Sequence, residues 1–245
     1  MSKPVITKAL IEQLADSETA LVCNALDTLH VAEPHTYYLD GDIACHTPDL
    51  PSLVGEVITI GLDSSTAKTT GDVEPYWRML EEISKSEVRR VVVVKSTGDN
   101  IRRACVMGDG MAKTFISVGA VGMVTDGGVR DLDGIIQQGF GVFCSGRVVQ
   151  HTQLHWSMLG EPMNLGGITI KSGDLIHGDS DGCIVVPSGA FDRIVPACAL
   201  VLAFEKRAHV LLRQSEISLQ EKRSIMKTYV EDLQRKIAAI EPASF

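Results

Sequence analysis

The stretch from residue 108 to residue 134, "GDGMAKTFISVGAVGMVTDGGVRDLDG", combines glycines with charged residues in two short turns. Gly108 and Asp109 form the first turn, and Arg130 and Asp131 follow a glycine pair in the second. Glycines beside charged side chains let a backbone pass close to a ligand. An arginine fork binds carboxylates, and aspartate oxygens bind Mg²⁺ or Mn²⁺. These residue types favour a site for a small anion and a divalent cation.

The first turn is predicted to open a helix. In that position Asp109 caps the helix, and the backbone N–H groups of residues 108–111 create a positive field suited to a carboxylate or a phosphate. The alternative is an ordinary helix cap without a ligand, because capping aspartates are common.

The second turn is predicted to bend sharply, with left-handed backbone angles at Gly127 and Gly128. Arg130 and Asp131 then lie at the carboxyl end of the preceding strand, where α/β folds bind ligands. Twenty residues, 110–129, separate Asp109 from Arg130, enough for a helix and one strand that return the chain to the same edge. Both acids are therefore expected to face one pocket. A surface Arg-Asp pair that closes a turn is the alternative.

The elements that must position these turns alternate between helical and strand patterns, which indicates an α/β layer architecture. Helices are expected at 6–14, 19–29, from about 75, at 110–118 and at 132–138, and strands at 53–62, 89–96, 122–125 and 141–144. Residues 35–51 are predicted to form a surface connection. The glycine-rich stretch 163–189 is typical of antiparallel hairpins, and residues 190–240 are predicted to be helical with a break near "QSEIS".

Composition limits the classes of partner. The chain of 245 residues has 44% hydrophobic residues, enough for one globular domain, and its net charge of -8 argues against a nucleic-acid partner. We find no long apolar run and no signal peptide, so no membrane partner is expected. The six cysteines are far apart without a CxxC pair, which favours reduced thiols and a cytoplasmic location.

The stretch "GDGMAKTFISVGAVGMVTDGGVRD" resembles the superfamily that joins the class II 4-hydroxy-4-methyl-2-oxoglutarate / 4-carboxy-4-hydroxy-2-oxoadipate aldolases with the regulator of ribonuclease activity A proteins. The stretches "LVCNALDTL", "RRVVVVKSTGDNIRRACVMGD" and "SGDLIHGDSDGCIVVP" extend the likeness over most of the chain. The Asp-X20-Arg-Asp spacing is similar to that of the lyases, whereas the regulators commonly carry glutamate after the glycine.

The resemblance implies one domain over residues 1–245. Its fold would be a layered α-β-β-α sandwich of the swivelling β/β/α type with N-terminal and C-terminal helices, and residues 215–245 would be a C-terminal helical extension. In that extension Ile217, Ile225, Met226, Tyr229 and Leu233 are expected to clasp a neighbouring subunit.

The resemblance also implies roles for the charged residues of the two turns. Asp131 matches the direct ligand of a divalent metal, Mg²⁺ or Mn²⁺, and Asp109 matches a residue that holds the metal through a water molecule. Arg130 matches the residue that binds the substrate and stabilises negative charge at its keto oxygen.

Further residues are implied around this centre. The backbone amides of Gly108, Asp109, Gly110 and Met111 match the loop that receives the pyruvate carboxylate. The family completes its site with a glutamate from a neighbouring subunit, for which Glu205 in "LVLAFEKRA" is the candidate, and it forms a homotrimer or a homohexamer. An ordinary exposed helix glutamate is the alternative for Glu205.

The implied function is metal-dependent cleavage of a 4-hydroxy-2-oxo acid to pyruvate by a retro-aldol reaction. Oxaloacetate decarboxylation passes through the same enolate, so one site serves both reactions. The substrate partner would be a small 2-oxo acid. Two alternatives stay open: a non-catalytic regulator that binds a ribonuclease, and a related lyase or isomerase of sugar-derived acids.

Two pairs of residues outside the turns have alternative interpretations. His151 and His155 lie four residues apart and could share a helix face, and a structural or solvent-facing role is favoured over metal ligation. Asp179 and Asp181 are predicted to be structural residues of a hairpin turn rather than ligands.

Overall fold

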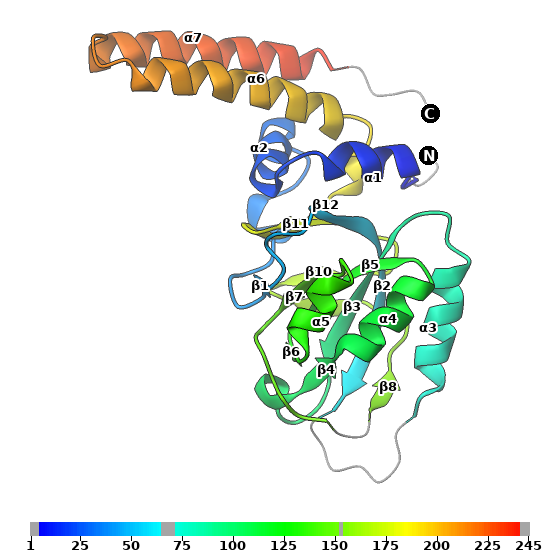
Figure 1. The fold of residues 1–245 in the computed structure, drawn as a ribbon. Helices are drawn as coiled ribbons and strands as arrows, with labels where there is room; N and C mark the ends of the chain where they lie inside the picture. The colour runs from blue at the N-terminus through cyan, green and yellow to red at the C-terminus, as the bar shows by residue number, and fades with distance from the viewer. Residues whose placement is uncertain (1–4, 65–71, 152–153, 241–245) are drawn as a thin grey trace.

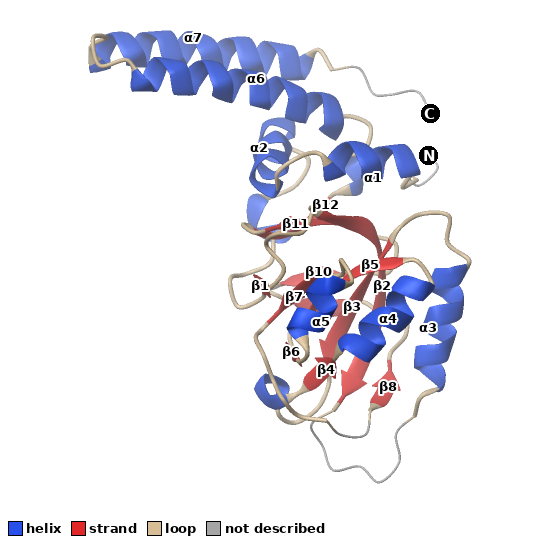
Figure 2. Ribbon diagram, viewed as in Figure 1, coloured by secondary structure: helices blue, strands red, loops and turns tan. Residues whose placement is uncertain are grey.

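The computed structural model describes residues 5–64, 72–151 and 154–240, which form helices around a large mixed sheet (Figures 1 and 2). The helices are α1 (Lys8–Ala15), α2 (Thr19–Leu29), α3 (Glu74–Ser84), α4 (Asp109–Ser117), α5 (Leu132–Gln137), α6 (Ile194–Arg213), α7 (Leu219–Ala238) and the short 3-10 turns η1 (Pro34–Thr36), η2 (Ile101–Arg103) and η3 (Ser188–Ala190). The strands are β1 (Ala44–Cys45), β2 (Leu53–Asp63), β3 (Arg90–Ser96), β4 (Cys105–Met107), β5 (Ala120–Thr125), β6 (Gly128–Val129), β7 (Gly141–Cys144), β8 (His155–Ser157), β9 (Met163–Leu165), β10 (Ile168–Ile170), β11 (Leu175–Asp179) and β12 (Gly182–Val186).

The strands of the main sheet follow the order β1-β7-β5-β3-β2-β11-β12, and β8 pairs with the end of β2. Its centre, β7-β5-β3-β2, is parallel, whereas β1 and β11 join it antiparallel. Helices α3, α4 and α5 cover one face of this parallel centre (Figure 2). The predicted α/β layer architecture is confirmed.

The unbroken apolar run of β3 is explained by burial on both faces of the sheet. Val92 and Val94 pack in the cluster beneath α3, α4 and α5. Val91 and Val93 point the other way, into a second cluster that includes residues of β9, β10 and β11. Because side chains alternate along a strand, a strand between two layers needs apolar residues at every position.

The late strands form the two predicted hairpins. Strands β9 and β10 pair antiparallel, as do β11 and β12. The structural reading of the turn aspartates is confirmed: the Asp179 carboxylate accepts the Asp181 N–H at 2.9 Å within the turn and the Thr19 N–H at 2.7 Å. Asp179 thus satisfies a donor at the start of α2, which ties the hairpin to that helix.

The segment from residue 35 to residue 51 is more buried than a surface connection. Tyr37, Leu39 and Ile43 are at most 8% exposed, and β1 pairs with β7. The Tyr37 hydroxyl donates to Asp27 at 2.6 Å, which anchors the segment to α2. The expectation of a purely superficial path was wrong, because isolated apolar side chains fill gaps in the core without any periodic pattern.

Helices α6 and α7 form an antiparallel pair that extends from the body (Figure 1), with the predicted break at residues 214–218. Ser218 begins α7 with a capping box to Glu221, and Asp232 pairs with Arg207 across the two helices at 3.3 Å. Leu233 packs in the core cluster within the chain, so it is not a free contact for a neighbour. No helix in the described ranges has the length and apolar character that a membrane crossing requires. The last five residues of the expected extension lie outside the described residues.

A fully buried histidine joins the β11–β12 hairpin to the N-terminal helices. The Nε2 atom of His177 lies 3.0 Å from the Leu14 carbonyl oxygen and its Nδ1 atom lies 3.0 Å from the Thr19 hydroxyl. Nε2 therefore donates to the carbonyl, and Nδ1 of the neutral ring accepts from the hydroxyl. Burial lowers the pKa of His177, because a charged imidazole loses its hydration there.

This lowered pKa predicts a loss of stability in mild acid. Because the pKa of His177 is lower in the folded chain than the unfolded value of about 6.5, the unfolded chain binds more protons at this residue as pH falls, and the free energy of unfolding therefore falls. We expect the wild type to lose more of its free energy of unfolding between pH 7.5 and pH 5.5 than the His177→Gln variant loses. Urea unfolding of the wild type and of His177→Gln at both pH values measures it. An equal pH dependence in the two proteins would contradict the assignment.

Candidate active site

The two charged turns meet because the strands before them pair. Strands β4 and β6 form a small parallel sheet, and the Arg130 N–H donates to the Met107 carbonyl at 3.0 Å. Gly108 directly follows β4, and Arg130 directly follows β6, so both turns leave the same edge. From the sequence, Arg130 was expected at the end of the strand that finishes at Thr125 and not after a separate strand β6. The intervening strand β6 has two residues, too few to show a periodic pattern.

The glycines of the second turn serve close packing rather than left-handed backbone. Neither Gly127 nor Gly128 has a positive φ angle, so that expectation was wrong. A Cβ atom at Gly127 would lie 2.6 Å from a methyl group of Val106, and one at Gly128 would lie 2.3 Å from a methyl group of Val148. The left-handed residue is Asp131, with φ 55°, which directly precedes α5.

The first turn differs from its prediction in the role of Asp109. Gly108 is the N-cap of α4, and no side chain caps the helix there. Asp109 is the first helical residue, and its carboxylate accepts a hydrogen bond from Lys113 Nζ at 2.7 Å. This hydrogen bond lowers the pKa of Asp109, which keeps the group ionised. The Met111 N–H bonds to the Gly108 carbonyl at 3.2 Å, so that amide is already engaged within the turn.

Both turns line one cavity of about 330 Å³, as predicted. Its walls are residues 105–111 of β4 and α4 together with Arg130 and Asp131. The lining also includes three residues that were not predicted there as a group: Gln150, His151 and Leu154. The Arg130 Nε atom lies 3.3 Å from an Asp131 carboxylate oxygen, and both side chains are partly exposed. A fixed positive group and a carboxylate thus stand together at an accessible surface.

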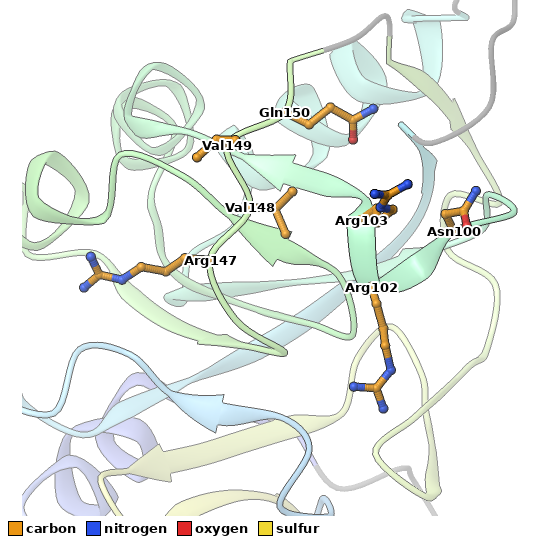
Figure 3. A pocket seen from close by; sticks show the side chains of 7 residues that line it. All are labelled: Asn100, Arg102, Arg103, Arg147, Val148, Val149 and Gln150. Atoms are coloured by element: carbon orange, nitrogen blue, oxygen red, sulfur yellow. The ribbon is translucent and has the colours of Figure 1, made fainter.

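Two further cavities adjoin this one. Asp109 and Asp131 also line a cavity of about 590 Å³ together with Asp133, Gly134 and Arg147. Arg147 and Gln150 in turn line a third cavity of about 560 Å³, whose other wall includes Arg102 and Arg103 (Figure 3). Arg147 could not be predicted from the sequence, because nothing in its local sequence marks it as a neighbour of residues 109 and 131.

Glu205 and the two histidines lie in three different places. Glu205 is on α6, where its carboxylate accepts from the Asn24 amide at 2.8 Å, and it does not line the cavities of Asp109 and Asp131 within this chain. His151 lines the first cavity. His155 belongs to strand β8, and its Nδ1 accepts the Asp72 N–H at 3.1 Å. The two histidines therefore share no helix face, because the chain forms a strand at residue 155.

The carboxylates suit a hydrated cation better than a closed protein cage. In the described ranges no group of three or more His, Cys, Asp or Glu side chains is arranged to hold a metal ion. Mg²⁺ usually keeps several waters and uses only one or two carboxylates, together with substrate oxygens. Asp131 and Asp109 on a common cavity fit that donor set. Zinc, which favours closed nitrogen and sulfur sites, fits poorly.

The chain belongs to the RraA-like family, whose model is described as Aldolase/RraA and matches residues 19–185. A relative from Halalkalibacterium halodurans, provisionally named a 4-hydroxy-4-methyl-2-oxoglutarate aldolase, is 31% identical over 140 residues. This alignment covers 56% of the chain and 63% of the relative, so the chain spans less than two thirds of that protein's length.

Solved structures support the same fold. A crystal structure of an uncharacterised protein from Pseudomonas syringae has a TM-score of 0.71 at 24% identity and covers 92% of this chain and 97% of its own. The structure of Streptomyces coelicolor RraAS2, described as an unusual member of the RNase ES inhibitor RraA family, has a TM-score of 0.66 at 23% identity, covering 84% and 98%. The family fold therefore occurs both in proteins named as aldolases and in a protein described as a ribonuclease inhibitor family member.

The close approach of the backbone to the charged pair gives a prediction for Gly108. A Cβ atom there would lie 2.8 Å from an Asp131 oxygen and 3.0 Å from Arg130 Nε, whereas one at Gly110 meets nothing within 4 Å. We expect Gly108→Ala to displace both side chains while stability changes by less than about 1 kcal/mol, because the ends of flexible side chains move at low cost. Gly110→Ala is the matched control. Crystal structures and thermal unfolding measure both effects, and unmoved Arg130 and Asp131 side chains in the Gly108→Ala variant would disprove the constraint.

Proposed function

We propose that this protein is a divalent-metal-dependent lyase that cleaves a 4-hydroxy-2-oxo acid of the 4-hydroxy-4-methyl-2-oxoglutarate type to pyruvate. The observation that carries the proposal is the meeting of Asp109, Arg130 and Asp131 on one cavity at the end of two paired strands. The relatives named as aldolases support the reaction type. The family also includes ribonuclease inhibitors, so the lyase proposal rests on the residues of the site rather than on family membership.

Different residues of the site are proposed to bind the metal ion, the keto oxygen and the carboxylate of a pyruvyl unit. Asp131 would hold Mg²⁺ or Mn²⁺ directly and Asp109 would hold it through water. When bound, the ion supplies Lewis-acid polarisation of the 2-keto group. The Arg130 guanidinium, beside Asp131, donates hydrogen bonds toward the keto oxygen as negative charge develops on it. The backbone N–H groups of Asp109 and Gly110 are the proposed receptors of the pyruvyl carboxylate.

The cleavage step breaks the bond between C3 and C4 of the substrate. Its electron pair stays with C3 and forms the enolate of pyruvate, while the 4-hydroxyl loses its proton and becomes a carbonyl. A water oriented by Asp109 is the proposed proton acceptor, and Lys113 keeps that carboxylate ionised. Protonation of C3 then yields pyruvate. Loss of CO₂ from oxaloacetate produces the same enolate, so we propose decarboxylation as a second activity.

Assembly with other copies forms part of the proposal. Within one chain Glu205 lies with Asn24 on α6 and α2, and it does not line the cavity. We propose that Glu205 reaches the site of a neighbouring copy in a homotrimer or homohexamer and acts there as a second candidate base. The partly exposed position of Glu205 on α6 leaves it accessible to such a neighbour.

Metal dependence provides the direct test of the proposed lyase. Purified protein incubated with a 4-hydroxy-2-oxo acid and Mg²⁺ is expected to release pyruvate, and EDTA is expected to abolish the release. Lactate dehydrogenase and NADH report the pyruvate formed. Turnover that persists after thorough chelation would contradict the mechanism. A protein without turnover that captures a ribonuclease would instead support the regulator hypothesis.

Two neighbouring substitutions separate the roles of the second turn. Asp131→Ala is expected to remove nearly all turnover and weaken Mg²⁺ binding, while the fold survives because the side chain is about half exposed. Arg130→Lys is expected to keep metal binding but lose about a hundredfold in rate, roughly 2.7 kcal/mol, because lysine lacks the planar fork. Steady-state rates and calorimetric Mg²⁺ titrations measure both. Near-normal turnover in Asp131→Ala would refute the site assignment.

A further inference from the structure

Arg147 is held beside the candidate site by backbone hydrogen bonds. Val129, the residue before Arg130, donates its N–H to the Gly146 carbonyl at 3.0 Å and accepts the Val148 N–H at 2.9 Å. Arg147 lies between these contacts and forms a parallel bridge with Val129. Gly146 has φ 147°, a backbone angle that glycine adopts readily. The position of Arg147 is therefore fixed relative to the second charged turn.

The Arg147 side chain lines a different cavity from Arg130, and the two cavities adjoin. Arg130 lines the cavity of about 330 Å³ and Arg147 lines the cavity of about 590 Å³, and the two cavities share Asp109 and Asp131. In Figure 3 the Arg147 guanidinium extends away from Arg102 and Arg103. A ligand bound near the shared aspartates thus has Arg130 in one adjoining cavity and Arg147 in the other.

The charges around the shared aspartates leave Arg147 available to an anion. Asp109 is paired with Lys113 at 2.7 Å, and Asp131 is paired with Arg130 at 3.3 Å. Among the residues that the structure describes, no carboxylate oxygen lies within 4.0 Å of the Arg147 guanidinium. Its side chain is exposed at the cavity. A charged, unpaired and positioned guanidinium at a cavity wall is suited to a carboxylate of the ligand.

We propose that Arg147 is a specificity-determining residue that binds the second carboxylate of a 2-oxo diacid, the one carried by the fragment that leaves after cleavage. This inference rests on the proposed function for the orientation of the substrate, with the pyruvyl end at Arg130. The distal carboxylate of a five-carbon diacid is at the opposite end of the molecule from the pyruvyl unit, and we place it in the adjoining cavity that Arg147 lines. Substrates without this carboxylate lose the contact and are selected against.

Ligand binding tests this assignment without any turnover. The probes are 2-oxoglutarate, which has no 4-hydroxyl to start a retro-aldol reaction, and 2-oxopentanoate, which has the same carbon chain without the distal carboxylate. Calorimetric titrations with Mg²⁺ are made on the full chain, on Arg147→Gln and on Arg103→Gln. Arg103 is the matched control, because it is also exposed and unpaired among the described residues but lines the cavity that contains none of the aspartates.

We expect the wild type and Arg103→Gln to bind 2-oxoglutarate at least about tenfold more tightly than 2-oxopentanoate. Arg147→Gln is expected to lose that preference and to keep its affinity for 2-oxopentanoate within about twofold. Three results would each overturn the inference: a preference that survives in Arg147→Gln, an equal loss of the preference in Arg103→Gln, or a wild type that binds neither acid. If the preference depends on Arg147 but no 4-hydroxy-2-oxo acid is cleaved, the lyase proposal fails while the assignment of Arg147 stands.

Discussion

The parallel pairing of β4 with β6, closed by the hydrogen bond from the Arg130 N–H to the Met107 carbonyl, is the constraint on which the candidate site depends. The neighbouring strands β3 and β5 of the main sheet bring the two chain segments to the same region. The small sheet then sets the register between the two turns. Because each turn begins directly after its strand, the backbone rather than flexible side chains determines where the charged groups stand.

Close packing around these strands explains why glycines surround the site. The backbone at Gly128 lies against Val148, and the backbone at Gly108 lies beneath the side chains of Arg130 and Asp131. A larger residue at Gly128 would press on Val148, whereas one at Gly108 would displace the two charged side chains. Asp131 takes a left-handed backbone, which a non-glycine residue adopts at some cost in energy. Such strain is found at functional sites, where the surrounding structure holds it in place.

The charge balance of the site depends on which of its basic side chains already form ion pairs. Lys113 and Arg130 pair with the two aspartates of the site, whereas Arg147 faces the same aspartates across a cavity. The family match ends at residue 185, so the site lies within the family fold and the α6–α7 pair follows it. That pair is tied to the body through the core cluster that it shares with α1 and α2.

Local patterns in the sequence predict the elements that are long or that carry marked turn residues. The sequence placed α2 and β7 at their observed bounds, and it found the buried β3, the late hairpins and the two charged turns, because each depends on local periodicity or on turn residues. It did not determine the two-residue strand β6, the packing role of Gly128 or the place of Arg147. Those depend on contacts between segments far apart in the chain, such as Val129 with Arg147 and Gly128 with Val148. Tertiary contacts specify these features, since the local sequence of one partner does not specify which residue it contacts.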